Sequence, residues 1–153
     1  MSQYILSIDQ GTTGSRCFIF DHQGKVISQA YQEFPQYFPK PGWVEHDGNE
    51  IWKSVQAVIL KSIKTSKIDP TKIIAIGITN QRETTLLWDR HTKCPVAKAI
   101  VWQDRRTDAI CQHLKKHEGE IQSLTGLKVD PYFSATKIAW LLDHHRGLRQ
   151  KAN

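Results

Sequence analysis

A polar turn between two apolar runs near the N-terminus has the residue types needed to hold a phosphate group. It extends from Asp9 to Arg16 with the sequence DQGTTGSR. In a turn rich in Gly, Thr and Ser, backbone N–H groups and hydroxyls can converge on phosphate oxygens. Asp9 could hold Mg²⁺ directly or through water, and Arg16 could contact a phosphate. An ordinary hairpin turn is the alternative, because neither the phosphate-loop pattern ending in Gly-Lys-Ser/Thr nor the dinucleotide-binding fingerprint is present.

A second polar segment, TNQRETT at residues 79–85, directly follows an apolar run that we expect to be a strand. In open sheets, ligands bind beyond the carboxyl ends of strands. The donor group of Arg82 beside the acceptor group of Glu83 suits vicinal hydroxyls, which both donate and accept hydrogen bonds. Adjacent strand residues point to opposite faces, so both can serve one ligand only if the backbone has left the strand. Otherwise they are exposed surface charges that contribute about 1 kcal/mol at most.

Two further groups of side chains in the C-terminal half could bind a ligand or a metal. Trp102 follows a short apolar run and could form a wall against the carbon face of a ligand, with core packing as the alternative. His113 and His117 stand at i and i+4 on an expected helix near Cys111, a spacing that could ligate Zn²⁺. No third or fourth ligand at characteristic spacing supports zinc, so we do not expect a zinc site there.

The elements that must position these residues begin with three strands. Apolar, β-compatible runs at residues 4–8, 16–20 and 25–34 are separated by short polar turns, which predicts an antiparallel meander. The proline-rich segment at residues 35–47 is expected to be a surface loop.

A helix and a further strand follow this loop. Asp47 and Glu50 have the spacing of a helix N-terminus in which each side chain satisfies a backbone donor. Apolar residues then recur at helical spacing, at positions 51, 55, 58, 59 and 63. Asp69-Pro70 ends this pattern, and the continuous apolar run at residues 73–78 predicts a strand that is covered on both faces.

The chain after residue 102 is predicted to be helical. Short strands are expected at residues 85–88 and 99–102, and a helix at residues 103–117. Ser134 is predicted to be the N-cap of a last helix that Gly147 ends. The order of the elements indicates an α/β layer fold whose sheet mixes parallel and antiparallel pairs.

Length and composition exclude several classes of protein. A chain of 153 residues with 39% hydrophobic and 24% charged residues is expected to be one globular domain with its own core. No apolar run could span a bilayer, and Asp9 interrupts any N-terminal signal peptide, so we expect neither membrane insertion nor secretion. Three widely spaced cysteines do not form a disulfide framework, which favours a cytoplasmic location.

The net charge of +6 at pH 7 raises the alternative of a basic nucleic-acid-binding domain. Residues 1–89 have equal numbers of acidic and basic side chains, so the excess lies from Arg90 onward, where acidic residues are interspersed. We therefore interpret the charge as solvated helix faces and expect no nucleic-acid partner.

Five segments taken together resemble the N-terminal part of the glycerol kinases, a group within the FGGY carbohydrate kinases. They are YILSIDQGTTGSR at residues 4–16, PKPGWVEHD at 39–47, IGITNQRETT at 76–85, IVWQDRRT at 100–107 and TGLKVDPYFS at 125–134. The NQRET segment is the most specific, because sugar kinases of the same superfamily differ there. It argues against kinship with a pentose or hexose kinase.

The resemblance implies a ribonuclease-H-like, actin-like ATPase fold with two domains around a cleft. Residues 1–153 would be the N-terminal part of the first domain, which would be incomplete, and the adenosine-binding domain would lie outside the chain. The implied reaction transfers the γ-phosphoryl group of ATP to glycerol with the help of Mg²⁺, giving sn-glycerol 3-phosphate and ADP. The full-length enzyme would be a homo-oligomer.

The resemblance also assigns nucleotide contacts to the first polar segment. Asp9 corresponds to the Mg²⁺-associated acid of the family, and Thr12, Thr13 and Arg16 correspond to contacts with the nucleotide phosphates. Gly14 replaces the serine that is usual in the family, which removes a side-chain contact but leaves the backbone cradle.

Residues of the later segments correspond to the glycerol site. Arg82, Glu83 and Tyr132 match the residues that hydrogen-bond glycerol, and Trp102 matches the wall against its carbon backbone. The catalytic aspartate of the family would lie beyond Asn153, so we expect the chain alone to be inactive. A ribonuclease-H nuclease is the competing interpretation of such a fold, but it needs a cluster of carboxylates for two metals that the sequence does not offer.

Overall fold

The computed structural model describes residues 3–151, which form two compact units. The first unit combines Met1–Gln36 with His46–Gln81, and the second combines Tyr37–Glu45 with Arg82–Asn153. Among the helices between residues 3 and 151, none has both the length and the apolar character that crossing a membrane requires.

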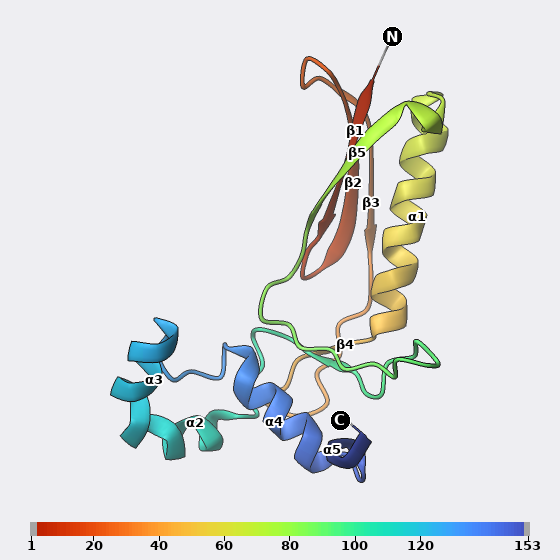
Figure 1. Cartoon of the computed structure of the whole chain (residues 1–153). Helices are drawn as coiled ribbons and strands as arrows, with labels where there is room; N and C mark the ends of the chain where they lie inside the picture. Colours follow the sequence, from red (N-terminus) through yellow and green to blue (C-terminus); the bar gives the residue numbers. More distant parts are fainter. Residues whose placement is uncertain (1–2, 152–153) are drawn as a thin grey trace. The chain divides into compact units, whose positions relative to one another are not determined.

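A four-stranded mixed sheet forms the first unit (Figure 1). The strands are β1 (Tyr4–Gln10), β2 (Gly14–Asp21), β3 (Val26–Glu33) and β5 (Ile73–Thr79), in the order β3-β2-β1-β5. The first three form the predicted antiparallel meander, whereas β5 lies parallel to β1. The prediction of a sheet with both kinds of strand pair is therefore confirmed.

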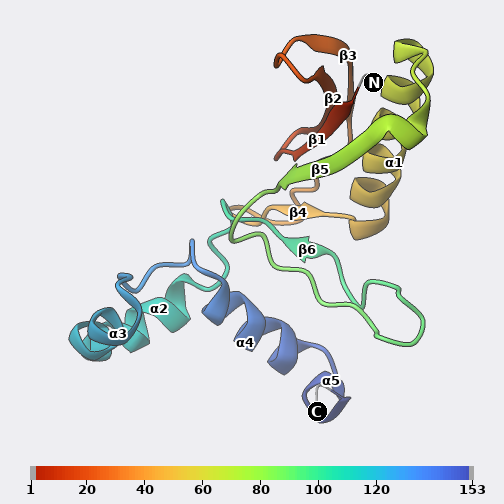
Figure 2. The same cartoon turned by 45° about the horizontal axis from the view of Figure 1, so that its top comes forward.

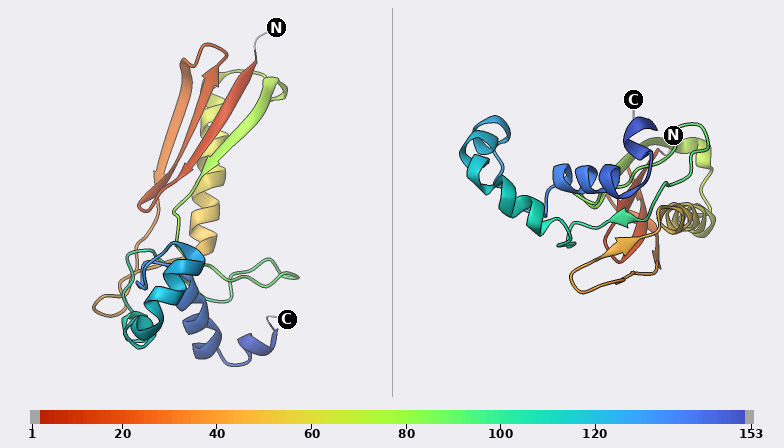
Figure 3. Two further views of the ribbon diagram at one scale, coloured as in Figure 1. Left: turned by 60° about the vertical axis from the view of Figure 1, so that its left-hand side comes forward. Right: turned by 90° about the horizontal axis from the view of Figure 1, so that it is seen from below.

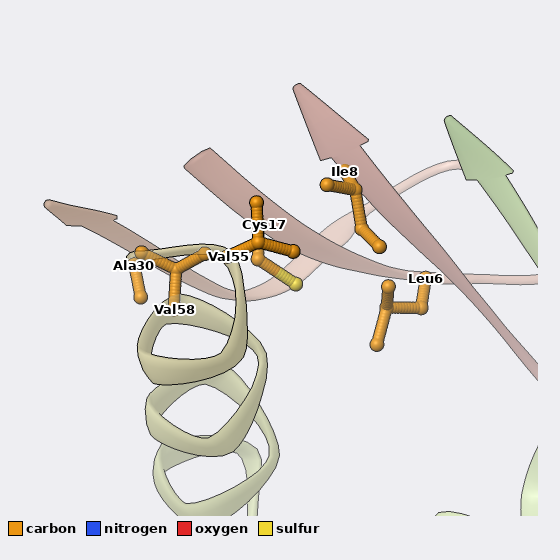
Figure 4. Close-up of a cluster of buried hydrophobic side chains, with 6 residues drawn as sticks. All are labelled: Leu6, Ile8, Cys17, Ala30, Val55 and Val58. Carbon is orange, nitrogen blue, oxygen red and sulfur yellow. The ribbon is translucent and has the colours of Figure 1, made fainter. Parts of the chain in front are cut away.

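The predicted helix, α1 (Gly48–Ser66), lies along one face of this sheet (Figure 3). Its N-cap is Asp47, whose side chain accepts a hydrogen bond from the backbone N–H of Asn49 at 2.8 Å. Alternate residues of the strands and the apolar stripe of α1 form the core of the unit (Figure 4). The buried residues of this core, which are labelled in Figure 4, are Leu6, Ile8, Cys17, Ala30, Val55 and Val58.

Strand β5 differs from the prediction that residues 73–78 are covered on both faces. Ile74, Ile76 and Ile78 are 59%, 60% and 73% exposed. Among the described residues β5 is an edge strand beside β1 (Figure 2), and α1 packs mainly against β2 and β3. The prediction is wrong for the described residues, because only Ile73, the first residue of β5, packs against the core that α1 covers.

Helices are the main regular elements of the second unit. Its helices are α2 (Asp108–Leu114), η2 (Lys115–His117), α3 (Glu118–Thr125), α4 (Ser134–His144) and α5 (Leu148–Lys151), and β6 (Ala99–Ile100) pairs with β4 (Glu45–His46). A short helix of the first unit, η1 (Pro70–Lys72), precedes β5.

Two elements predicted for the second unit differ from the structure. Residues 85–88 do not form a strand: Thr85 and Trp88 make isolated bridges only, to Ile100 and Pro95. The side chain of Asp89 accepts hydrogen bonds from the backbone of residues 91 and 92, which turns the chain back directly after Trp88.

The helix expected at residues 103–117 begins only at position 108, because Asp104 holds the preceding residues in a turn. Its carboxylate accepts hydrogen bonds from the backbone N–H groups of Val44 at 2.6 Å and Arg106 at 2.8 Å. Asp104 and Arg106 also form a buried ion pair at 2.8 Å, with side chains 1% and 2% exposed. The guanidinium group of Arg106 lies 3.8 Å from the ring centroid of Trp43 and pairs with Glu45 at 2.8 Å. This pair fixes the start of the helical region.

Candidate functional site

The turn between β1 and β2 contains the predicted phosphate-binding residues. The backbone N–H of Gly11 donates to the carbonyl of Gly14 at 2.9 Å, which closes the turn. Asp9 and Arg16 are direct partners in the antiparallel pair of β1 and β2, so their side chains lie on the same face of the sheet. Asp9 is half-buried and Arg16 is exposed. The turn therefore brings a carboxylate and a guanidinium group to the same end of these strands.

Tyr31 on β3 is a neighbour of this turn that the sequence did not reveal. A Cβ atom at Gly14 would lie 2.6 Å from the carbonyl oxygen of Gln32 and 2.7 Å from the hydroxyl of Tyr31, so glycine is required there. The Tyr31 hydroxyl is 3.5 Å from Oγ1 of Thr13, and the guanidinium group of Arg16 lies 5.2 Å from the Tyr31 ring centroid. The only signal for this neighbour is the register of the meander, in which Arg16 and Tyr31 are partners.

The buried imidazole of His46 is connected to this turn through glutamine side chains. The side chain of His46 is 0% exposed, and its Nε2 is 2.7 Å from Oε1 of Gln36 while its Nδ1 is 3.3 Å from Nε2 of Gln81. Because Oε1 can only accept and an amide nitrogen can only donate, Nε2 carries the proton and Nδ1 accepts. Burial lowers the pKa of His46 to about 4. The imidazole is thus neutral at pH 7.

Side-chain amides connect this imidazole to the backbone of the turn on both sides. On one side, Nε2 of Gln36 donates to the carbonyl of Thr12 at 2.8 Å. On the other side, Nε2 of Gln81 donates to Oε1 of Gln10 at 3.2 Å, and Nε2 of Gln10 donates to the carbonyl of Gly11 at 2.8 Å. This hydrogen-bond network, which we call the His46 network, holds two consecutive carbonyl groups of the turn.

The polar segment after β5 has left the strand, as the shared-ligand interpretation requires. Glu83 has a backbone φ of 65°, which is uncommon for a residue other than glycine. Its Oε2 accepts hydrogen bonds from the backbone N–H of Ser134 at 3.0 Å and from the Ser134 hydroxyl at 2.8 Å. The prediction that Ser134 caps the last helix is therefore wrong: Ser134 is the first residue of α4, and the carboxylate of Glu83 satisfies the helix end instead. The neighbouring Arg82 is exposed.

Lys137 is a second residue that the sequence did not reveal. It lies on α4 with a side chain that is 0% exposed. Its Nζ donates to the main-chain carbonyl of Glu83 at 2.9 Å and to that of Tyr132 at 2.5 Å. Burial lowers the pKa of Lys137, and the nearby negative charge of Glu83 opposes this effect. Its position one helical turn before the buried Leu141 was the available signal.

The predicted aromatic residues lie together in the second unit. The rings of Trp102 and Tyr132 meet edge to face with centroids 6.0 Å apart. Trp102 is half-buried, and its backbone N–H donates to Oγ1 of Thr84 at 3.3 Å. Tyr132 is 36% exposed, and its main chain is held by Lys137 together with that of Glu83. The structure thus brings together Glu83, Trp102 and Tyr132. Arg82 directly precedes Glu83 in the sequence.

The residues proposed as metal ligands have different surroundings. Between residues 3 and 151, no group of three or more His, Cys, Asp or Glu side chains has an arrangement that could hold a metal ion by itself. Cys111 is buried with its Sγ 3.9 Å from Oγ1 of Thr136, whereas His113 and His117 are exposed. Asp9 is a single carboxylate, which suits a cation that is also held by phosphate oxygens and water.

Comparison with known proteins relates the chain to carbohydrate kinases. Residues 4–153 match the family model described as the N-terminal domain of the FGGY family of carbohydrate kinases. A protein of Petrotoga mobilis named glycerol kinase is 60% identical over 99% of this chain and 31% of its own length. The chain therefore spans about a third of the length of this relative.

Solved structures agree with this relationship. The Plasmodium falciparum glycerol kinase with ADP superposes with a TM-score of 0.90 at 36% identity, over 98% of this chain and 30% of that one. A gluconate kinase from Lactobacillus acidophilus gives a TM-score of 0.84 at 27% identity, over 94% of this chain and 29% of that one. The predicted actin-like ATPase fold is confirmed by these neighbours. The chain belongs to the FGGY family of carbohydrate kinases.

Proposed function

We propose that the protein containing this chain is a glycerol kinase, which transfers the γ-phosphoryl group of ATP to glycerol. The observation that carries this proposal is the cluster of Glu83, Trp102 and Tyr132 beside the exposed Arg82. A fixed carboxylate, a donor fork and an aromatic wall suit a small polyol, whose hydroxyls need both donors and acceptors. The relative from Petrotoga mobilis that carries the name glycerol kinase supports this substrate.

Each residue of the cluster has a distinct part in holding glycerol. Because Oε2 of Glu83 already accepts from Ser134, Oε1 would be the atom that accepts a hydrogen bond from a glycerol hydroxyl. Arg82 donates to neighbouring hydroxyl oxygens. The edge-to-face pair of Trp102 and Tyr132 lies against the carbon backbone, and the Tyr132 hydroxyl adds a hydrogen bond.

The turn between β1 and β2 would hold the phosphates of the nucleotide. Thr12, Thr13 and Gly14 contribute backbone N–H groups and hydroxyls, and Arg16 contributes positive charge. The single carboxylate of Asp9 fits Mg²⁺, which proteins commonly hold through one or two carboxylates together with substrate phosphates and water. When bound, the ion neutralises charge on the phosphate oxygens. The Plasmodium relative in complex with ADP supports nucleotide use.

The chain would supply only part of this enzyme. We propose that it is the N-terminal part of the first domain and that the catalytic aspartate and the adenosine-binding domain lie in further sequence. Its three cysteines are free thiols, which supports a cytoplasmic location. Assembly of the enzyme into a homo-oligomer stays a prediction.

The proposal is tested by steady-state kinetics of the full-length enzyme. Wild-type enzyme should release ADP in a glycerol-dependent way, whereas the 153-residue chain alone should not. Arg82→Ala should lower kcat/KM for glycerol by the equivalent of about 1.5 to 3 kcal/mol, the range for a hydrogen bond to a charged group. Arg90→Ala, at another exposed arginine of the second unit, is the control. An Arg82→Ala enzyme with unchanged kcat/KM, or turnover with gluconate but not with glycerol, would contradict the assignment.

A further inference from the structure

Lys137 is a buried charged side chain that the proposed reaction does not use. Its ammonium group is completely enclosed and donates to two main-chain carbonyls rather than to a carboxylate. Removing an ammonium group from water is strongly unfavourable, and an apolar residue of similar length would avoid this cost. A contribution to stability is therefore a weak explanation for a lysine at this position of α4.

The two carbonyls that Lys137 holds belong to two residues of the proposed glycerol site. Glu83 and Tyr132 are far apart in the sequence, and the same Nζ lies 2.9 Å from one carbonyl and 2.5 Å from the other. Glu83 needs such support, because its φ of 65° is unfavourable for a residue with a side chain. The hydrogen bond to its carbonyl fixes the peptide plane from which the carboxylate extends.

We propose that Lys137 is a positioning residue for the acceptor substrate, which sets the Glu83 carboxylate and the Tyr132 ring at a fixed separation through their main chains. This inference rests on the proposed function. Lys137 does not touch the substrate; it acts through the two residues that do. A misplacement of about 1 Å in such a site can lower a rate by about a hundredfold. The effect of losing Lys137 should fall on glycerol and not on ATP, because no predicted phosphate-binding residue is bonded to it.

The test compares Lys137→Met with Lys128→Met in the full-length enzyme. Lys128 is an exposed lysine that precedes α4 and serves as the matched control. Lys137→Met keeps the length of the side chain but removes its donors. It should lower kcat/KM for glycerol roughly 10- to 150-fold while the KM for ATP stays within about twofold. The control should match the wild type in both quantities.

A second variant covers the case in which Lys137→Met does not fold. Lys137→Arg keeps the charge, but its planar guanidinium group cannot direct donors to both carbonyls in the same geometry. It should fold and show the same selective loss for glycerol. Wild-type kinetics in either variant, or equal losses for glycerol and ATP in the variants that fold, would overturn the positioning role. A wild-type enzyme that does not phosphorylate glycerol would instead overturn the proposed function, and the inference with it.

Discussion

Replacing His46 by glutamine should remove a pH-dependent loss of stability that the buried imidazole causes. The pKa of His46 is lowered from its ordinary value of 6.5 to about 4, so in the folded protein the ring stays neutral between these values. The unfolded chain binds a proton in the same range. Folding stability must therefore decrease as the pH falls from about 6.5 towards 4, and stay constant with respect to this group below that.

The magnitude follows from the two pKa values. A difference of about 2.5 pH units corresponds to about 3 kcal/mol in total, of which about 2 kcal/mol is lost between pH 7 and pH 5. The hydrogen bonds act in the same direction as burial. Protonation at Nδ1 would place a second donor against the amide N–H group of Gln81.

Urea unfolding of wild type and His46→Gln at pH 7 and pH 5 measures this effect. Glutamine is neutral at both values, so the variant should gain about 2 kcal/mol relative to the wild type on going to pH 5. His22→Gln, at an exposed histidine of the same unit, is the matched control. Parallel stability profiles for wild type and His46→Gln would refute the reasoning. An NMR signal assigned to the His46 imidazole that titrates near pH 6.5 would refute it as well.

Two further substitutions test a close backbone contact and a buried ion pair, each with a control variant. Gly14→Ala places a methyl group 2.6 Å from the carbonyl oxygen of Gln32 and should lower the free energy of unfolding by roughly 1 to 3 kcal/mol. Gly77→Ala, whose Cβ would meet nothing within 4 Å, should be neutral or slightly stabilising in the same urea experiment. Arg106→Met leaves a buried carboxylate without its partner and should cost about 3 to 5 kcal/mol. Arg105→Met, at an arginine that is 54% exposed, should change stability by less than about 1 kcal/mol, and a similar loss in both variants would contradict the role of burial.

The parts of the fold that could be predicted are those with local signals. The meander of β1 to β3 is encoded by short apolar runs and turn residues, and the start of α1 by the cap at Asp47. The exposure of β5 could not be predicted, because an apolar run does not reveal what covers it. The irregular start of the helical region depends on Asp104, which acts on Val44, a residue sixty positions away.

The candidate site shows the same limit. Sequence patterns predicted which residues face a ligand from the chemistry of their side chains, and this assignment stays a prediction. The residues that hold them in place were missed, since they act through tertiary contacts. The sequence does not show that Ser134 donates to the carboxylate of Glu83, nor that Lys137 donates to its main-chain carbonyl. Tyr31 and the His46 network belong to the same class of supporting residues.

The exposure of β5 also affects how the chain behaves among copies of itself. Between residues 3 and 151, β5 pairs with β1 alone, so its other edge presents main-chain N–H and C=O groups to an approaching strand. The segment IIAIGIT contains no charge and no proline, the composition typical of sequences that stack into intermolecular cross-β layers. The substitution Ile76→Lys would place a charge in this segment and oppose such stacking.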